Sequence, residues 1–264
     1  MASEQNNQNK EKTSLIDELQ RKGLFESISA LFRSIMVPVH PDGWVFVLSF
    51  AGVSFFLSLF SESLGFLGIL LTAWCFYFFR DPERVAPSQQ DEEDAIVSSA
   101  DGLIVSVLRC PPPSESSCGE QEMNRISVFM NVFDVHVNRM PFRGIVKSKT
   151  HVPGTFLNAM LERASVQNER VVLDICRSDG VFCVVVQVAG LLARRIRCDV
   201  DVDDDVDCGQ RFGLIRFGSR VDIYMPVQAK VHVREGQRAV AGETILASLP
   251  LKAKSAAPSA QPKT

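Results

Sequence analysis

The sequence contains no Cys-x-x-Cys pair, although it has seven cysteines among its 264 residues. An odd number of unpaired cysteines is poorly suited to a disulfide framework or a zinc site, and it predicts free thiols in a reducing compartment. The four histidines also lack the spacing of metal ligands, so no metal site is predicted. Excess positive charge is absent as well. The formal net charge is −3, whereas nucleic-acid-binding domains are usually basic, so no nucleic-acid partner is expected.

Charged side chains are nearly absent between residues 44 and 79, where Glu62 is the one exception. The uncharged stretches 44–60 and 63–79 are each about as short as a membrane-spanning helix can be, near ~17 residues. The Ser61-Glu62-Ser63 sequence between them suits a turn. The pattern therefore predicts two apolar helices joined as a hairpin.

Positive charges flank this apolar region on both sides. Arg33 precedes it, and Arg80 and Arg84 follow it, which predicts that both ends lie on the cytoplasmic side of a membrane. We therefore expect residues 36–86 to form a membrane-associated helical hairpin at the cytoplasmic face of the cell membrane. The sequence leaves open whether the hairpin spans the bilayer or only dips into one leaflet. A pair of helices buried in a protein core is the alternative.

The two ends of the chain have compositions unlike the rest. Residues 1–12 are rich in Gln, Asn, Lys and Glu, which predicts disorder. Residues 14–35 have apolar residues near helical spacing, so the tail 1–35 is expected to include an amphipathic helix on the membrane surface or packed on the main domain. Residues 253–264 are expected to form a flexible tail.

Between these segments, residues 87–252 alternate short β-branched runs with turn residues, which predicts a mostly β (α+β) domain with antiparallel strands. Expected strands are Ala95–Val97, Leu103–Leu108, Arg125–Phe129, Gly144–Thr150, Arg170–Cys176, Val181–Val188, Ile196–Val202, Arg220–Met225, Ala229–Val233 and Ile245–Ser248. One helix is expected at about 155–163, followed by a loop at Ala164–Asn168. Two similar glycine turns, at Gly209 and Gly242, are like the hairpins of biotinyl and lipoyl carrier domains. No lysine lies at a hairpin tip, so a carrier role is not expected.

One short run near the C-terminus, Arg216–Asp222, places Gly218 directly before Ser219. A Gly-Ser dipeptide alone usually marks a turn. Here it follows several other motifs in a fixed order: Phe78–Arg84, Ser99–Gly102, Phe133–Arg139, Asn168–Arg170 and Ala189–Ile196. Ordered matches over residues 76–226 are far more specific than any one motif. On these motifs the chain resembles the phosphatidylserine decarboxylase family, in its short bacterial form.

The resemblance implies a self-cleaving enzyme that makes its own cofactor. Its backbone would be cut between Gly218 and Ser219, and Ser219 would become a pyruvoyl (pyruvate) group. The products would be a large chain, 1–218, and a small chain, 219–264, held together as a heterodimer without a covalent bond. The pyruvoyl group would form a Schiff base with the amine of phosphatidylserine, releasing carbon dioxide and phosphatidylethanolamine.

The resemblance also suggests residue roles. Gly218 has no side chain to block attack on its carbonyl, and His136 is the candidate base, with Asp101 orienting it or stabilising its cation. Longer family members carry a second histidine in this motif, and here that position is Arg139. This leaves open whether His136 serves both self-cleavage and decarboxylation. Arg194 and Arg195 are candidates for the lipid phosphate, but neighbours on a strand face opposite ways, so at most one is expected to reach it.

Expected partners are phosphatidylserine and the membrane lipids around it. Two alternatives remain at this stage. One is a pyruvoyl decarboxylase acting on another serine-containing phospholipid or on an amino acid. The other is an uncut, membrane-tethered β module that binds without catalysis.

Overall fold

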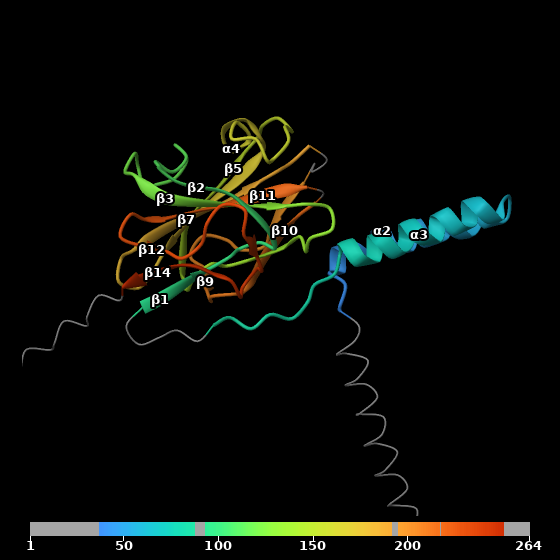
Figure 1. Cartoon of the computed structure of the whole chain (residues 1–264), viewed down its shortest axis with the longest axis horizontal. Helices are drawn as coiled ribbons and strands as arrows, with labels where there is room; N and C mark the ends of the chain where they lie inside the picture. Colours follow the sequence, from blue (N-terminus) through green and yellow to red (C-terminus); the bar gives the residue numbers. More distant parts are fainter. Residues whose placement is uncertain (1–36, 88–92, 192–194, 217, 251–264) are drawn as a thin grey trace, which may run out of the picture.

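The computed structural model describes residues 37–87, 93–191, 195–216 and 218–250. The expected amphipathic helix in 14–35 and the tail 253–264 lie outside these residues. A β domain makes up most of the described chain, and a two-helix arm projects from one end of it (Figure 1). This arrangement confirms the prediction of a mostly β fold preceded by an apolar helical hairpin.

The main sheet has eight strands in the order β13-β2-β3-β11-β7-β6-β5-β9, with antiparallel pairing between neighbours. The strands are β2 (Gly102–Cys110), β3 (Met123–Met130), β5 (Gly144–Val152), β6 (Arg170–Cys176), β7 (Phe182–Val188), β9 (Asp205–Val206), β11 (Ser219–Pro226) and β13 (Arg238–Ala239). Branched apolar residues such as Val128, Val185 and Ile223 are buried between this sheet and the smaller ones. Strand β11 lies near the middle of the sheet, with a partner on each side.

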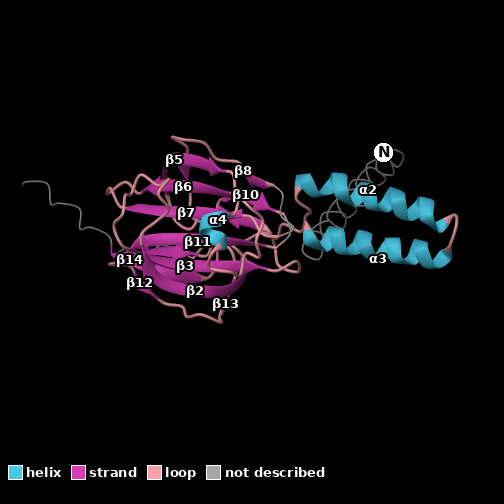
Figure 2. Cartoon of the chain, turned by 90° about the horizontal axis from the view of Figure 1, so that it is seen from above, coloured by secondary structure: helices cyan, strands magenta, loops and turns pink. Residues whose placement is uncertain are grey.

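Two three-stranded sheets complete the β domain. The first contains β1 (Glu93–Val97), β14 (Ile245–Pro250) and β12 (Lys230–Val231), in the order β1-β14-β12. The second contains β4 (Val137–Arg139), β10 (Arg211–Ile215) and β8 (Ile196–Cys198), in the order β4-β10-β8. Strands β8 and β10 end beside the base of the helical arm (Figure 2). This second sheet therefore connects the β domain to the arm.

The prediction of a helix at about 155–163 is wrong. That segment is not helical, and the short helix α4 (Ala164–Gln167) occupies the expected loop. The side chain of Asn168 binds both the N–H and the C=O of Leu157, at 2.9 and 2.8 Å. The carbonyls of Ala159 and Leu161 accept hydrogen bonds from the buried Arg220 guanidinium, both at 3.2 Å. These long-range side-chain contacts hold the segment in a loop despite its helical periodicity.

The arm consists of α2 (Pro41–Ser58) and α3 (Glu62–Phe78). Proline suits the start of a helix, and the His40 side chain caps α2 by accepting a hydrogen bond from the Asp42 N–H. Where the helices meet, small residues allow close approach, because a Cβ on Gly68 would lie 2.5 Å from Ser54 Oγ. The helices therefore pack through small residues and point their large ones outward.

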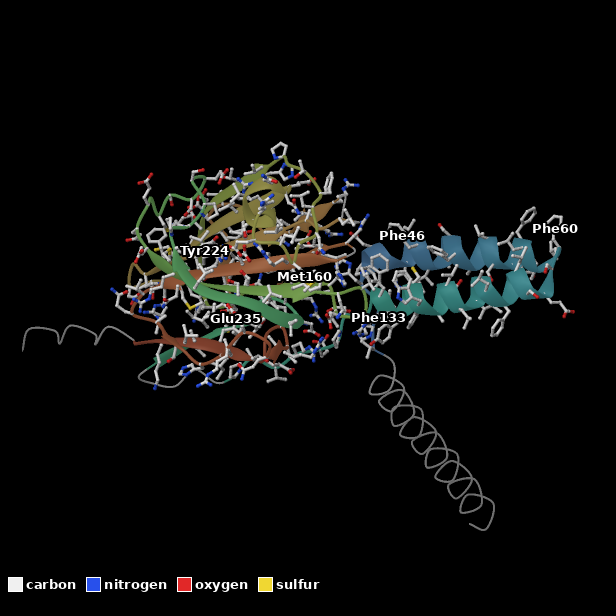
Figure 3. The ribbon with its side chains drawn as sticks, turned by 45° about the horizontal axis from the view of Figure 1, so that its top comes forward. Phe46, Phe60, Phe133, Met160, Tyr224 and Glu235 are labelled. Atoms are coloured by element: carbon white, nitrogen blue, oxygen red, sulfur yellow. The ribbon has the colours of Figure 1, made fainter. Side chains whose placement is uncertain are left out.

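Large apolar side chains on the arm face away from protein. Figure 3 shows Phe46 at the base of the hairpin and Phe60 at its tip. Phe60 is 71% exposed, and α2 is long and apolar enough to cross a membrane while only 17% of its apolar window is buried. α3 is apolar but shorter. Helices of a soluble core would be mostly buried, so the core-helix alternative does not fit.

The base of the arm packs against the β domain. Phe78 and Phe79, at the end of α3, pack with Val135, Val137 and Leu214 from the β4-β10 region. An isolated bridge between Val39 and Arg80 closes the base. The apolar arm is therefore joined directly to the strand segment that contains His136.

Candidate functional site

Ser219 is the first residue of β11 and lies opposite Met130 of β3. Its side chain is fully buried. Gly218 before it has a φ of +65°, in the left-handed region that favours glycine. The Gly218-Ser219 peptide therefore lies at a sharp backbone corner that leads into a central strand.

Gly190 contacts the carbonyl that precedes Ser219. A Cβ built on Gly190 would lie only 1.6 Å from the Gly218 oxygen and 2.7 Å from its carbon. No side chain larger than hydrogen fits at position 190 unless the Gly218 carbonyl moves. Gly190 therefore fixes the place of that carbonyl by backbone contact alone.

His136 lies next to the backbone nitrogen of Gly218. Its Nδ1 is 3.0 Å from the Asp134 carbonyl oxygen, and the Gly218 N–H donates to its Nε2 at 3.4 Å. A carbonyl oxygen only accepts, so Nδ1 carries the proton and Nε2 keeps its lone pair. The basic nitrogen of this histidine is therefore the one that contacts the Gly218 N–H, in the residue directly before Ser219.

The surroundings of His136 favour its neutral form. Burial lowers the pKa of His136 to about 4, the Asp134 carbonyl acts in the opposite direction, and the Arg80 charge adds to the lowering. The Phe78 ring covers the imidazole, with centroids 4.3 Å apart. At neutral pH the ring is therefore uncharged and able to accept a proton.

The hydroxyl of Ser219 makes only a weak contact. Its Oγ donates to Met130 Sδ at 3.9 Å, and thioether sulfur is a poor acceptor. Within the described part of the chain no hydrogen bond joins this hydroxyl to His136. The hydroxyl is thus buried, and its one described hydrogen bond is to a poor acceptor.

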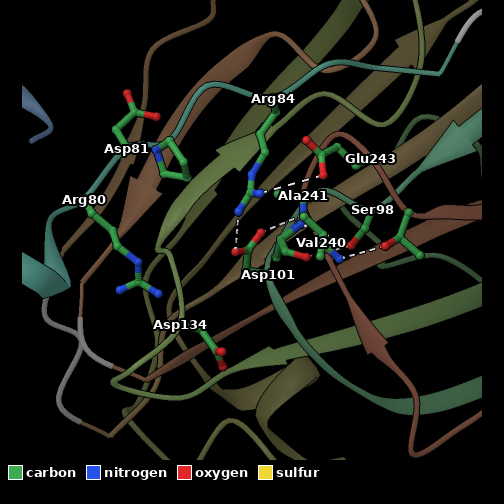
Figure 4. A network of polar contacts seen from close by, with 12 residues as sticks. Arg80, Asp81, Arg84, Ser98, Asp101, Asp134, Val240, Ala241 and Glu243 are labelled. Atoms are coloured by element: carbon green, nitrogen blue, oxygen red, sulfur yellow. Dashed lines mark hydrogen bonds and ion pairs between the residues drawn. The ribbon is translucent and has the colours of Figure 1, made fainter. Parts of the chain in front are cut away.

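Asp101 lies in a different network (Figure 4). Its carboxylate accepts from the Ala241 N–H at 2.7 Å and from Arg84 at 2.9 Å. Burial raises the pKa of Asp101, against the opposite effects of these two donors. No hydrogen bond links Asp101 to His136 among the described residues. The partner of His136 Nδ1 is the Asp134 carbonyl, so the predicted role of Asp101 in orienting the histidine or stabilising its cation would not act through a direct hydrogen bond.

A buried amide pair close to Ser219 was not expected from the sequence. Gln187 Nε2 donates to Asn138 Oδ1 at 2.8 Å, and Asn138 Nδ2 contacts Met130 Sδ at 3.6 Å. Both amides are fully buried. Nothing in the sequence separates Gln187 from its apolar strand neighbours, although Asn138 belongs to the histidine motif.

Gly190 could have been identified from the sequence. A glycine directly after an apolar strand often marks a close approach of two backbones, and this one lies inside a recognised motif. Of the two arginines proposed for the lipid phosphate, Arg194 lies outside the described residues. Arg195 is exposed and lines a separate pocket near the base of the arm.

Comparisons with known proteins show the family of this chain. The profile of the family described as phosphatidylserine decarboxylase matches residues 71–247. The phosphatidylserine decarboxylase proenzyme of Rickettsia typhi is 45% identical over 216 residues, covering 82% of this chain and 92% of that protein. The proenzyme of Rickettsia akari is 46% identical over the same shares of both chains. The chain therefore belongs to the phosphatidylserine decarboxylase family.

Proposed function

We propose that this protein is a pyruvoyl-dependent phosphatidylserine decarboxylase that matures by cleaving itself between Gly218 and Ser219. The contact that carries the proposal is the placement of His136 Nε2 at 3.4 Å from the Gly218 nitrogen. Gly190 supports it, because it leaves room for the Gly218 carbonyl beside a buried serine.

Self-cleavage begins when Ser219 Oγ adds to the Gly218 carbonyl carbon. His136 Nε2 takes the hydroxyl proton and passes it to the Ser219 nitrogen as the C–N bond breaks, which leaves an ester and a free Ser219 amine. Loss of the Ser219 α-proton then breaks the Cβ–O bond and releases the Gly218 carboxylate. The remaining dehydroalanine tautomerises to an imine, and water hydrolyses it with loss of ammonia. Every atom of the new end group except one oxygen from water comes from Ser219.

The residues around position 219 fit a pyruvoyl group. The site is buried, so bulk water is largely kept away from the group once it has formed. When formed, this group supplies an electron sink for loss of carbon dioxide from an amine-bearing substrate. In this proposal His136 also returns a proton to the substrate carbon.

Asp101 acts, in this proposal, as a positioning residue. Its carboxylate joins Arg84, just after the helical arm, to the Ala241 turn near the C-terminus. The Ser99 carbonyl in the same segment accepts from the Arg139 N–H in β4, at 2.9 Å. Asp101 thus braces the strand that follows His136 rather than contacting the ring.

The two product chains would stay together after cleavage. Strand β11, the first strand of the small chain, pairs with β3 on one side and β7 on the other. Neither ladder is broken by cutting the peptide before Ser219. This supports a non-covalent heterodimer of chains 1–218 and 219–264.

The arm would insert into the cell membrane from the cytoplasmic face. Its exposed apolar residues suit lipid, and Arg80 lies where the arm returns to the β domain. Arg80 and the nearby Arg84 give the positive flank that faces the cytoplasm. The site at Ser219 would then lie close to the membrane surface, where its lipid substrate is found.

The test is release of labelled carbon dioxide from carboxyl-labelled phosphatidylserine in mixed micelles. The purified wild-type protein should release it, and the Ser219→Ala variant should not. If the protein instead decarboxylates free serine, or prefers another serine-containing phospholipid to phosphatidylserine, then the proposed substrate is wrong. An uncut wild-type chain without activity would support a binding module instead.

A further inference from the structure

A polar pocket lies between the start of α2 and the β8-β10 edge. Its volume is about 490 Å³, and it is lined by Asp42, Arg195, Ile196, Arg197, Cys198 and Arg216. Figure 2 shows β8 and β10 beside the base of α2, so the pocket is at the junction of the arm and the β domain. No step of the proposed self-cleavage uses these side chains.

Positive charge dominates the lining of this pocket. Three guanidinium groups face one carboxylate, that of Asp42. Asp42 pairs with Arg197 and also with Arg216, at 3.2 Å for the latter. Arg195 is exposed and forms no ion pair with any described residue. The pocket therefore suits an anion that can share several guanidinium donors.

Most of the donor capacity of these arginines is unused. A guanidinium has five N–H donors. The described contacts use one from Arg216, to Asp42, and two from Arg197, to Asp42 and Asp199. The Arg216 group also lies over the Phe46 ring, with its carbon 5.0 Å from the ring centroid. This stacking holds one guanidinium in place and leaves its remaining edges for a ligand.

The position of the pocket at the base of the apolar arm indicates which class of anion it binds. Phe46 and the exposed Trp44 belong to the first turns of the apolar arm, and tryptophan is enriched where membrane meets water. Phospholipid phosphates lie at that level. Arg216 is also only two residues before Gly218, so the pocket adjoins the approach to the cleavage site.

We propose that this pocket binds the phosphodiester of an anionic membrane phospholipid. The proposal rests on the proposed function for the arm's place in the membrane. The phosphodiester has two sources: the phosphatidylserine that is about to react, or a neighbouring anionic lipid that holds the enzyme on the surface. Arg195 and Arg216 are the main donors, and Asp42 limits the affinity because its carboxylate competes for the same groups.

Binding is measured on the full-length Ser219→Ala chain in neutral detergent, by calorimetry with short-chain phosphatidylserine, short-chain phosphatidylglycerol and inorganic phosphate. This variant stays uncut, so the result does not depend on enzyme activity. Arg195→Gln should weaken lipid binding about tenfold, the scale of one charge-assisted hydrogen bond. Asp42→Asn should strengthen it, because it removes the competing carboxylate.

Arg143→Gln is the matched control, because Arg143 is an exposed arginine away from the pocket and the substitution removes the same charge. It should leave binding unchanged. Equal losses in Arg195→Gln and Arg143→Gln would overturn the proposal, as would binding of inorganic phosphate without either lipid. Weaker binding in Asp42→Asn would also contradict it.

Comparing the binding of phosphatidylserine with that of phosphatidylglycerol distinguishes the two sources of the phosphodiester. Binding of phosphatidylserine alone assigns the pocket to the substrate, and Arg195→Gln should then raise the KM of the mature enzyme with kcat retained. Equal binding of both lipids assigns it to anionic lipid in general, and phosphatidylglycerol should then stimulate the wild-type enzyme more than Arg195→Gln. If the wild-type protein proves inactive while lipid still binds, only the proposed function fails.

Discussion

The Phe78 ring lies over the His136 imidazole, with ring centroids 4.3 Å apart and an angle of 36° between the ring planes. Phe78 is the last residue of α3, so the apolar arm ends directly on the candidate base. This contact excludes water from one face of the histidine and restricts its rotation. It links the position of the arm to the geometry of the candidate site.

Replacing Phe78 by leucine should therefore slow self-cleavage. An aromatic pair contributes about 0.5–1.5 kcal/mol beyond its burial, which corresponds to a rate loss of up to about tenfold. Phe66→Leu is the control, because Phe66 is exposed in the same helix. Cell-free synthesis into liposomes, followed by gel analysis over time, measures the cleavage rate. Equal rates for both variants would remove Phe78 as a positioning residue.

Self-cleavage should resist mild acid. The base must be neutral to accept a proton, and the pKa of His136 is lowered to about 4, chiefly by burial. The rate should stay level between about pH 8 and about pH 5 and fall as the pH drops through about 4. Uncut chain collected early from cell-free synthesis and transferred to a series of buffers gives this profile. A midpoint near the ordinary histidine value of 6.5 would contradict the buried, neutral ring.

Gly190→Ala should block self-cleavage. The added methyl would lie 1.6 Å from the Gly218 oxygen, so the carbonyl must move. A displacement of about 1 Å at a reacting group can cost about a hundredfold in rate. Gly52→Ala is the control, because a Cβ there meets nothing within 4 Å. Resistance to limited proteolysis shows whether the uncut variant is folded, and normal cleavage of a folded Gly190→Ala chain would refute the assigned contact.

Asp101 can be tested by comparing two substitutions. Asparagine keeps an acceptor for the Ala241 N–H, whereas alanine removes it along with the Arg84 pair. A positioning role predicts that Asp101→Asn is cut faster than Asp101→Ala, with the same pH midpoint in both. Equal loss in the two variants, together with a shifted midpoint, would instead show that the Asp101 charge acts on His136.

Lysine substitutions on the apolar arm should weaken its binding to the membrane. Phe55 and Phe66 are exposed near the hairpin tip, and lysine at a membrane centre costs about 2.5–3.5 kcal/mol. The double substitution Phe55→Lys with Phe66→Lys should move protein from the membrane pellet to the soluble fraction. Leu108→Lys, on β2 of the β domain, should not. Retention of the doubly charged arm would place the anchor elsewhere, for example in residues 14–35.

Much of this architecture was predictable because it depends on local patterns. Glu62 alone interrupts the apolar stretch, and the structure starts α3 at that residue. The longer strands, such as Arg170–Cys176, coincide with their β-branched runs. The two-residue strands β9, β12 and β13 are too short to show a clear period, so their bounds depend on the partners they pair with.

The site was harder to predict because its contacts join distant segments. Asp134 contacts the histidine through its backbone carbonyl, which no side-chain pattern reveals. The loop at 155–163 is shaped by Asn168 and Arg220, which follow it in the chain. The sequence predicted Gly218, Ser219 and His136 as site residues, and in the structure the Gly218 N–H contacts His136 directly before Ser219. The sequence also predicted that Asp101 orients His136 or stabilises its cation, and in the structure its carboxylate accepts from the Ala241 N–H and from Arg84.

The central claim is that the chain cuts itself before Ser219 and converts that residue. Intact mass measurement of the purified protein under denaturing conditions tests it most directly. The account predicts two chains, with the smaller one beginning at position 219 and lighter by one ammonia than the same chain with an N-terminal serine. A single chain of full mass, or a small chain that keeps its serine, would contradict it.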